Sequence, residues 1–176
     1  MGGMIAQLLA SHYPERSLSL TSIMSSSGAR NLPRSNRKIS LQMMNRPKIA
    51  GEQAYIENSV KLYQLIGSPA YMPSDEELRN KARRSYQRSY HPQGYARHIA
   101  AIVASGDRVK ALAKITTPSL VIHGKADALV PVAAGIDTAE RIANAKLELF
   151  EGMGHDLPEP LLPQFVELIS RHAKSV

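Results

Sequence analysis

Cysteine is absent from this sequence of 176 residues. Its absence excludes disulfides, thiolate catalysis and cysteine-based metal sites, and it fits a reducing cytoplasm. No segment approaches the roughly 20 apolar residues of a membrane span, and the N-terminus lacks the basic leader and long apolar core of a signal peptide. We therefore expect a cytoplasmic protein with no contact to a membrane.

Metal-binding patterns are also missing. The sequence has no His-x-x-x-His pair and no carboxylate cluster with the spacing of metal ligands. It contains no internal repeat and no Gly-x-Ser-x-Gly motif. We expect neither a metal nor a cofactor.

Acidic residues are scarce in the middle of the chain. From Arg30 to Lys114 there are 16 Lys and Arg against 6 Asp and Glu, a charge of +10 that the remaining residues lower to the total of +7. Such an excess can indicate nucleic-acid binding, but no nucleic-acid motif accompanies it. A solvated helical face explains the charge better, so we expect no nucleic-acid partner.

Short apolar runs at both ends of the chain predict an α/β fold. Residues 18–24, 118–123 and 146–150 have the patterns of strands, and the run at 118–123 is apolar enough for burial on both faces. Helical periodicity covers residues 4–12, about 131–143 and 160–173. The alternation of strand and helix after residue 115 indicates a parallel sheet.

Residues 29–115 differ from both ends. Prolines divide this segment, and helices are predicted over 51–66, 74–90 and 93–104, with Ser74 and Glu77 forming a capping box. We interpret it as a helical insertion. The expected organisation is a core segment at 1–28, the insertion at 29–115 and a second core segment at 116–176.

Two polar residues follow consecutive predicted strands. Asp127 comes after the strand at 118–123, and His155 comes after the strand at 146–150. Because the carboxyl ends of parallel strands share one edge of a sheet, the two side chains are expected to lie close together. A histidine oriented by a carboxylate is the base half of a nucleophilic triad.

The first residues complete a resemblance. Met1-Gly2-Gly3 followed by a helix resembles the second half of the nucleophile elbow of α/β-hydrolases, and Gly152-Met153-Gly154-His155 resembles the histidine loop of that superfamily. The helical insertion at 29–115 resembles the cap of that superfamily. Together with the strand at 18–24 and the Asp127 turn, these motifs resemble the C-terminal portion of a serine esterase. Small carboxylesterases of the aclacinomycin methylesterase type are the most similar group.

This resemblance implies specific roles. Asp127 would be the triad acid, His155 the general base, and the backbone N–H of Met1 one oxyanion donor. The nucleophile would precede Met1, so we expect the complete form to hydrolyse small-molecule esters and this chain alone to be nearly inactive. The alternative is a non-catalytic remnant or an interaction module that self-associates through an exposed sheet edge.

Less specific interpretations remain open for several side chains. Asp127 could be a turn residue or a helix cap, Asp156 is a rival acid, and the serines at 25–27 are poor candidates for a nucleophile. His123 is expected to be structural, and the other histidines to lie at the surface or the edge of the core. Residues that line either a substrate pocket or the core of the cap are Met43, Met44, Tyr55, Tyr63, Tyr71 and Met72.

Overall fold

Three parallel strands form the centre of the molecule. The computed structural model describes residues 1–44 and 51–175. In it, β1 (Leu20–Ile23), β2 (Ser119–Gly124) and β3 (Lys146–Phe150) lie in the order β1-β2-β3, with Leu20 opposite Ser119 and Leu120 opposite Lys146. All six residues of β2 are buried. The predicted α/β class with a parallel sheet is confirmed.

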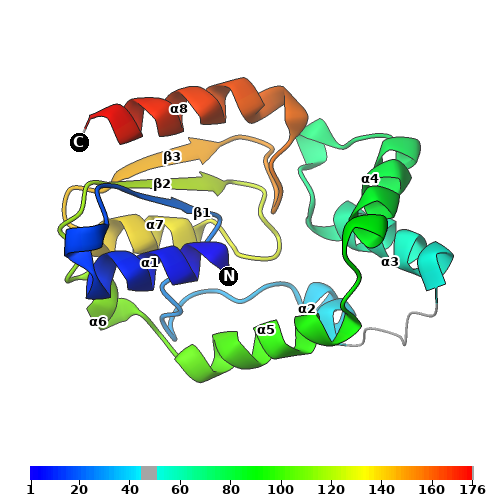
Figure 1. Ribbon diagram of the computed structural model, residues 1–176, viewed down its shortest axis with the longest axis horizontal. Coiled ribbons are helices and arrows are strands. Elements are labelled where there is room, and N and C mark those ends of the chain that lie inside the picture. Colours follow the sequence, from blue (N-terminus) through cyan, green and yellow to red (C-terminus); the bar gives the residue numbers. More distant parts are fainter. Residues whose placement is uncertain (45–50, 176) are drawn as a thin grey trace.

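Helices cover the sheet on both faces (Figure 1). One layer contains α1 (Gly2–His12), α6 (Val109–Leu112) and α7 (Ala133–Arg141), and α8 (Leu162–Lys174) lies on the opposite face. A short 3-10 turn, η1 (Pro14–Arg16), follows α1, and another, η3 (Glu159–Leu161), precedes α8. This arrangement leaves the carboxyl ends of the strands at one edge, where the loops carrying polar side chains emerge.

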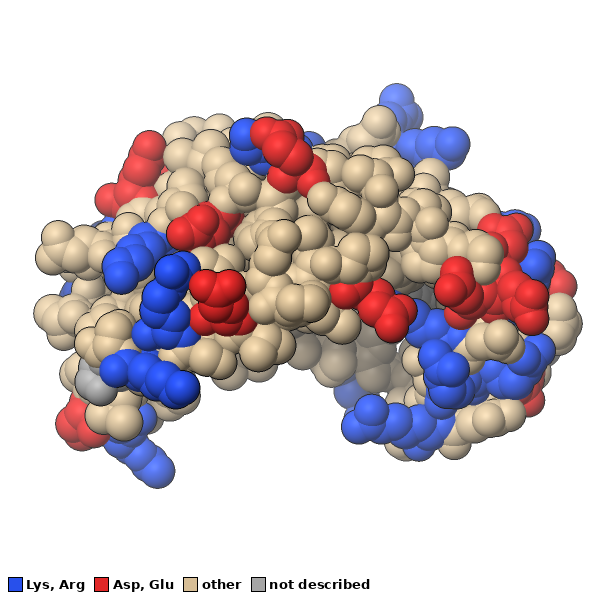
Figure 2. All heavy atoms as spheres, turned by 90° about the horizontal axis from the view of Figure 1, so that it is seen from above, with Lys and Arg blue, Asp and Glu red and all other residues tan. Residues whose placement is uncertain are grey.

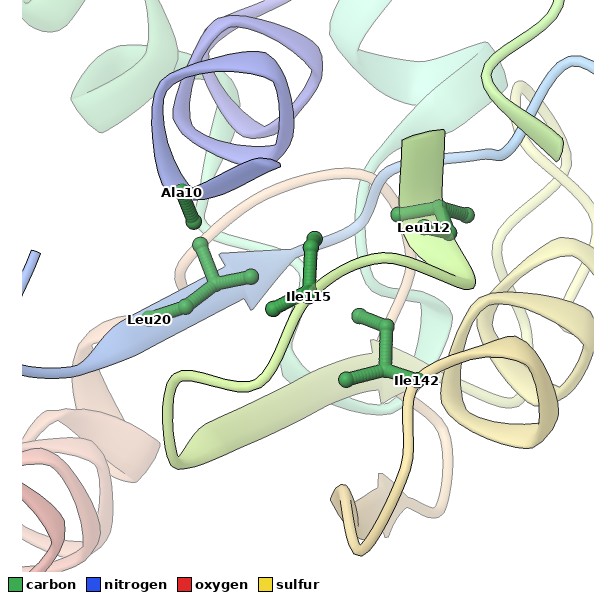
Figure 3. Packing of buried hydrophobic residues seen from close by; sticks show 5 residues of the cluster. All are labelled: Ala10, Leu20, Leu112, Ile115 and Ile142. Atoms are coloured by element: carbon green, nitrogen blue, oxygen red, sulfur yellow. The ribbon is translucent and has the colours of Figure 1, made fainter. Parts of the chain in front are cut away.

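Each face of the sheet has its own apolar core. Figure 3 shows the first core, in which side chains from α1, β1, the α6 region and the end of α7 converge. The second core joins β2 to α8 through Leu120, Ile122 and Phe165, with the fully buried Met153 from the loop after β3. The residues of the first core are Ala10, Leu20, Leu112, Ile115 and Ile142.

A glycine allows α1 to approach β1 closely. A Cβ on Gly3 would lie 2.6 Å from Cβ of Ser25, whereas a Cβ on Gly2 would meet nothing within 4 Å. One turn further on, the buried Gln7 donates a hydrogen bond from Nε2 to Oγ of Ser22 at 3.0 Å. Of the two glycines that begin the chain, Gly3 is therefore the one that the packing requires.

The segment between β1 and β2 is helical, as predicted. It contains α2 (Arg37–Met44), α3 (Gly51–Ile66), η2 (Pro69–Tyr71), α4 (Asp75–Arg88), α5 (Pro92–Ser105) and α6, and none of its described residues forms a strand. Figure 1 shows α3 and α4 side by side at one end of the molecule, away from the sheet. The predicted capping box of Ser74 and Glu77 begins α4.

Arg108 joins the two ends of this insertion. Its guanidinium donates to the carbonyl of Ser26, where the chain leaves β1, and to the carbonyl of Gly106, where it returns. The side chain is buried, and burial lowers the pKa of Arg108, a shift that the charge of Asp107 opposes. Backbone carbonyls therefore replace a carboxylate as the partners of a buried cation.

Among the helices described for residues 1–44 and 51–175, none combines the length and the hydropathy of a membrane-spanning segment.

Candidate active site

Asp127 lies in a tight turn directly after β2. One oxygen of its carboxylate, Oδ1, accepts backbone hydrogen bonds from Leu129 at 2.9 Å and from Val130 at 2.7 Å. The side chain is fully buried. The turn depends on Gly124, because a Cβ there would lie 2.2 Å from the carbonyl oxygen of Met153 in the neighbouring loop.

His155 contacts the other oxygen of the same carboxylate. Its Nδ1 lies 2.7 Å from Oδ2 of Asp127, and a quarter of the imidazole surface is exposed. With Asp127 ionised, Nδ1 carries the proton, which leaves Nε2 as the free acceptor of a neutral ring. This is the arrangement of a histidine base held by a carboxylate, and none of the described residues forms a hydrogen bond with that Nε2.

His123, in β2, lies next to the carboxylate of Asp127. It is completely buried in β2, its Nε2 lies 2.8 Å from the carbonyl oxygen of Val130, and the same nitrogen lies 3.5 Å from Oδ2 of Asp127. The expected structural role of His123 agrees with these contacts. Gly135 in α7 makes room for the ring, since a Cβ there would lie 2.4 Å from Nδ1 of His123.

The surroundings of Asp127 favour its ionised form. Burial acts to raise the pKa of the carboxyl group, but hydrogen bonds from His123, His155 and the backbone of Val130, together with the charge of His155, outweigh it. The pKa of Asp127 is consequently lowered from its ordinary value. A buried carboxylate that remains ionised can stabilise an imidazolium beside it.

Asp156, the rival acid, has other partners. Its carboxylate accepts hydrogen bonds from the hydroxyl of Tyr63 at 2.5 Å and from the hydroxyl of Ser68. Burial, and then the hydrogen bond and charge of Asp156, raise the pKa of Tyr63, so its phenol remains a donor. Asp127 is thus the carboxylate that His155 contacts, although Asp156 is its neighbour in sequence.

The remaining predicted site residues have other contacts. Met1 is the N-cap of α1, and burial followed by the charge of Arg108 lowers the pKa of its amino group. The ring of Tyr55 in α3 packs against those of Tyr86 and Tyr90, with centroids 5.4 and 5.6 Å away, in a tilted and an edge-to-face arrangement. Tyr63 bonds Asp156, as described above.

The other predicted pocket residues are Met43, Met44, Tyr71 and Met72. Met43 is partly exposed on α2, and the side chain of Met44 is outside the described residues. Met72 lies with Tyr71 and Pro73 beside a cavity of about 460 Å³ that also touches Glu159. A contribution of these residues to a substrate pocket stays a prediction.

A groove of about 410 Å³ separates α4 from the segment after His155. Lys81 and Arg84 line one wall, and the exposed side chains of Leu157 and Leu162 line the other. Figure 2 shows that basic side chains gather around a hollow at the end of the molecule formed by α3 and α4. Part of this charge is compensated, because Arg79 lies 3.9 Å from Asp75 and Arg83 lies 3.9 Å from Glu52.

Within the described part of the chain, no group of three or more His, Cys, Asp or Glu residues could hold a metal ion.

Comparison with known proteins identifies the fold and the family. The sequence matches the hydrolase family described as serine aminopeptidase, S33, over residues 1–159. The chain belongs to this family, Hydrolase_4, of the α/β-hydrolase superfamily. The match covers both loops of the candidate site, so Asp127 and His155 lie within the shared region.

Individual relatives share only a small fraction of identical residues with this chain. The chain is 26% identical to the rhodomycin D methylesterase DauP of a Streptomyces species over 194 residues, covering 99% of this chain and 65% of that protein. Among solved structures, it resembles 2-hydroxy-6-oxo-6-phenylhexa-2,4-dienoate hydrolase from a Rhodococcus species (TM-score 0.73, 16% identity, 99% and 61% of the two chains). It also resembles an enol-lactonase from Burkholderia xenovorans (TM-score 0.73, 19% identity, 99% and 63%).

The chain therefore spans less than two thirds of the length of these relatives. It forms part of an α/β-hydrolase fold, with a sheet of three described strands.

Proposed function

We propose that Asp127 and His155 are the acid and the base of an ester hydrolase that acts through a Ser-Asp-His mechanism. The carrying observation is the 2.7 Å contact between Nδ1 of His155 and the buried, ionised carboxylate of Asp127. Membership of the family and similarity to a protein named as a methylesterase support a carboxylic ester of a small molecule as the substrate.

In this mechanism each residue has one task. Nε2 of His155 takes the proton of a serine hydroxyl as its oxygen attacks the ester carbonyl, and then gives that proton to the leaving alcohol. Water attacks the resulting acyl-enzyme with His155 again as the base. Asp127 fixes the tautomer of His155 and stabilises the imidazolium. The backbone nitrogen of Met1, at the positive end of α1, is the proposed oxyanion donor.

The serine of this proposal would precede Met1, so the 176 residues alone should hydrolyse an activated ester at the background rate. Loss of the nucleophile from such a triad reduces turnover by on the order of 10⁶. Robust turnover that disappears in His155→Ala would contradict this part of the proposal, because it would locate a nucleophile within these residues.

The roles of the acid and the base need a chain that contains a serine. In a chimera, a relative's N-terminal segment that ends in a strand and Gly-x-Ser would be joined ahead of Met1. We expect His155→Ala to reduce its kcat by on the order of 10⁶, and Asp127→Asn by about 10⁴. His98→Ala, which changes an exposed histidine of α5, is the matched control and should leave kcat unchanged.

A second candidate function is self-association, and the observation that favours it is an uncovered apolar surface. In the described part of the chain, β1 pairs with β2 alone, so its other edge is open. On the neighbouring helix α1, Met1, Ile5 and Leu9 are 41%, 58% and 49% exposed. Neither element carries a charged side chain, apart from the titratable His12, that would repel a second copy.

Sedimentation analysis distinguishes a self-associated chain from a monomer. We expect the parent chain to sediment as a concentration-dependent dimer, and the double variant Ile5→Glu, Leu9→Glu as a monomer with the same helical content. A parent chain that remains monomeric at high concentration would contradict self-association and leave the esterase proposal untouched.

A further inference from the structure

We propose that Ser68 is a positioning residue for His155, and that the end of cap helix α3 thereby holds the base against Asp127. This inference rests on the proposed role of His155 as the base. It follows from contacts between the segment 63–70 of the cap and the loop 152–156 that carries the histidine. These two segments are far apart in the sequence.

One hydroxyl bonds both neighbours of His155. Oγ of Ser68 accepts a hydrogen bond from the backbone N–H of Gly154 at 2.9 Å, and the same hydroxyl donates to the carboxylate of Asp156. Ser68 is completely buried, so water cannot replace either bond. The residues before and after the histidine are consequently attached to one side chain of the cap.

The backbone of His155 is attached to the same helix end. Its N–H donates to the carbonyl oxygen of Ile66 at 2.7 Å. Ile66 is the last residue of α3, where helix carbonyls have no partner within the helix. A carbonyl at a helix terminus and a loop N–H thus satisfy each other's hydrogen-bonding capacity, and this bond fixes the backbone of His155 relative to α3.

Close backbone approach makes the contact rigid. A Cβ on Gly154 would lie 2.3 Å from the carbonyl oxygen of Gly67, and a Cβ on Gly152 would lie 2.3 Å from Cβ of Ala70. The amide of Ala70 also donates to the carbonyl of Gly152 at 3.2 Å. Because the two backbones already touch and are joined by hydrogen bonds, a displacement of the cap would move the histidine loop with it.

Tyr63 extends this network away from the site. Its hydroxyl donates to Asp156, and the ammonium of Lys81 in α4 lies 3.3 Å from that hydroxyl and 4.8 Å from the centre of the ring. With both oxygens of Asp156 engaged by hydroxyls, this carboxylate is held by the cap, and Nδ1 of His155 is bonded by Asp127 instead.

His155 is therefore held by hydrogen bonds from two parts of the molecule. Asp127, in the core, fixes the ring, and α3 with Ser68, in the cap, fixes the backbone. Removing the Ser68 hydroxyl should loosen the ring from Asp127 even though neither catalytic side chain has changed. This is the effect that separates positioning from a general loss of stability.

The test uses NMR of the 176-residue chain and requires no hydrolysis. In the parent we expect a slowly exchanging Nδ1–H proton of His155 that Asp127→Asn abolishes. Ser68→Ala should broaden or abolish this signal and accelerate exchange of the Gly154 and His155 amides by about 10-fold or more. Ser68→Thr, which retains the hydroxyl, should restore the signal.

Ser85→Ala, an exposed serine of α4, is the matched control and should behave as the parent. The proposal is overturned if Ser68→Ala retains the Nδ1–H signal and the parent exchange rate at His155. If Ser68→Ala fails to fold, Ser68→Cys decides the question, because it fills the buried position and replaces the hydroxyl that bonds Gly154 and Asp156 with a thiol, a weak donor and acceptor. An unchanged Nδ1–H signal and His155 amide exchange in Ser68→Cys would then overturn the proposal.

The proposed function fails in a different way. If the parent chain itself lacks a bonded Nδ1–H proton, the pairing of His155 with Asp127 is wrong, whatever Ser68 does.

Discussion

Asp127→Asn separates the electrostatic role of the buried carboxylate from its role in the turn. The carbonyl oxygen of asparagine can still accept the two backbone hydrogen bonds from Leu129 and Val130 that Oδ1 of the carboxylate accepts. The amide nitrogen, however, replaces the oxygen that faces Nδ1 of His155 at 2.7 Å. The variant therefore preserves the turn and removes a charge-assisted hydrogen bond.

The magnitude follows from that single bond. A hydrogen bond to a charged group contributes about 1.5–3 kcal/mol to the free energy of unfolding. A quarter of the His155 ring is exposed, and a change of tautomer lets Nδ1 accept from the new amide. We therefore expect a loss at the lower end, about 1.5 kcal/mol at neutral pH.

The pH dependence has a definite sign. Because the pKa of Asp127 is lowered in the folded state from its ordinary value of 3.8, the carboxylate contributes stability above that pH. This contribution disappears as the pH falls through the folded value. The difference in stability between the parent and Asp127→Asn should accordingly decrease as the pH falls below 3.8.

Urea denaturation followed by circular dichroism, repeated across this pH range, measures both effects. Asp107→Asn is the control, since Asp107 is exposed and accepts a comparable backbone bond from Val109 at 3.2 Å. It should change the free energy of unfolding by less than about 0.5 kcal/mol. A loss in Asp127→Asn that persists undiminished in acid would refute the reasoning, because an ionised carboxylate could not be its cause.

Two further predictions concern the glycines of α1 and the hydrogen bonds of Arg108. Gly3→Ala should reduce the free energy of unfolding by about 1–3 kcal/mol, since its Cβ would lie 2.6 Å from that of Ser25. Gly2→Ala has open space around it and should instead stabilise the helix by up to about 1 kcal/mol, and urea denaturation of the two variants measures both effects. Arg108→Met should separate the two ends of the helical segment between β1 and β2, because it removes the hydrogen bonds to the carbonyls of Ser26 and Gly106. We expect rapid proteolysis within residues 29–115 while far-ultraviolet dichroism is retained, and a protease pattern identical to that of the parent would contradict this role.

Elements with a strong periodic signal could be predicted from the sequence. The strand expected at 146–150 is β3, and the helix expected at 51–66 is α3, both with the same bounds. The short helix α6 escaped prediction because four residues span barely one turn and show no period. The helix α2 escaped because its residues mix charged, polar and apolar types between two prolines.

The contact of Asp127 with His155 could be predicted for a topological reason. Both residues follow adjacent parallel strands, so the sheet itself brings the two loops together. Ser68 and Tyr63 had no comparable signal, because their partners in the loop lie 88 and 93 residues away in the sequence. The glycines of the loop Gly152-Met153-Gly154 indicate close backbone approach, but they do not reveal that α3 is the neighbour.

The two carboxylates near His155 illustrate how surroundings decide chemistry. Asp127 and Asp156 are equally acidic as free amino acids, and Asp156 is the closer in sequence. Asp127 is bonded by backbone N–H groups on one oxygen, which leaves the other oxygen to orient the imidazole. Asp156 accepts one hydroxyl hydrogen bond on each oxygen, from Tyr63 and from Ser68, so its carboxylate joins the loop to the segment at 63–68. The distribution of donors from two distant segments, rather than the residue type, places one carboxylate against the imidazole of His155 and the other against the segment that holds its loop.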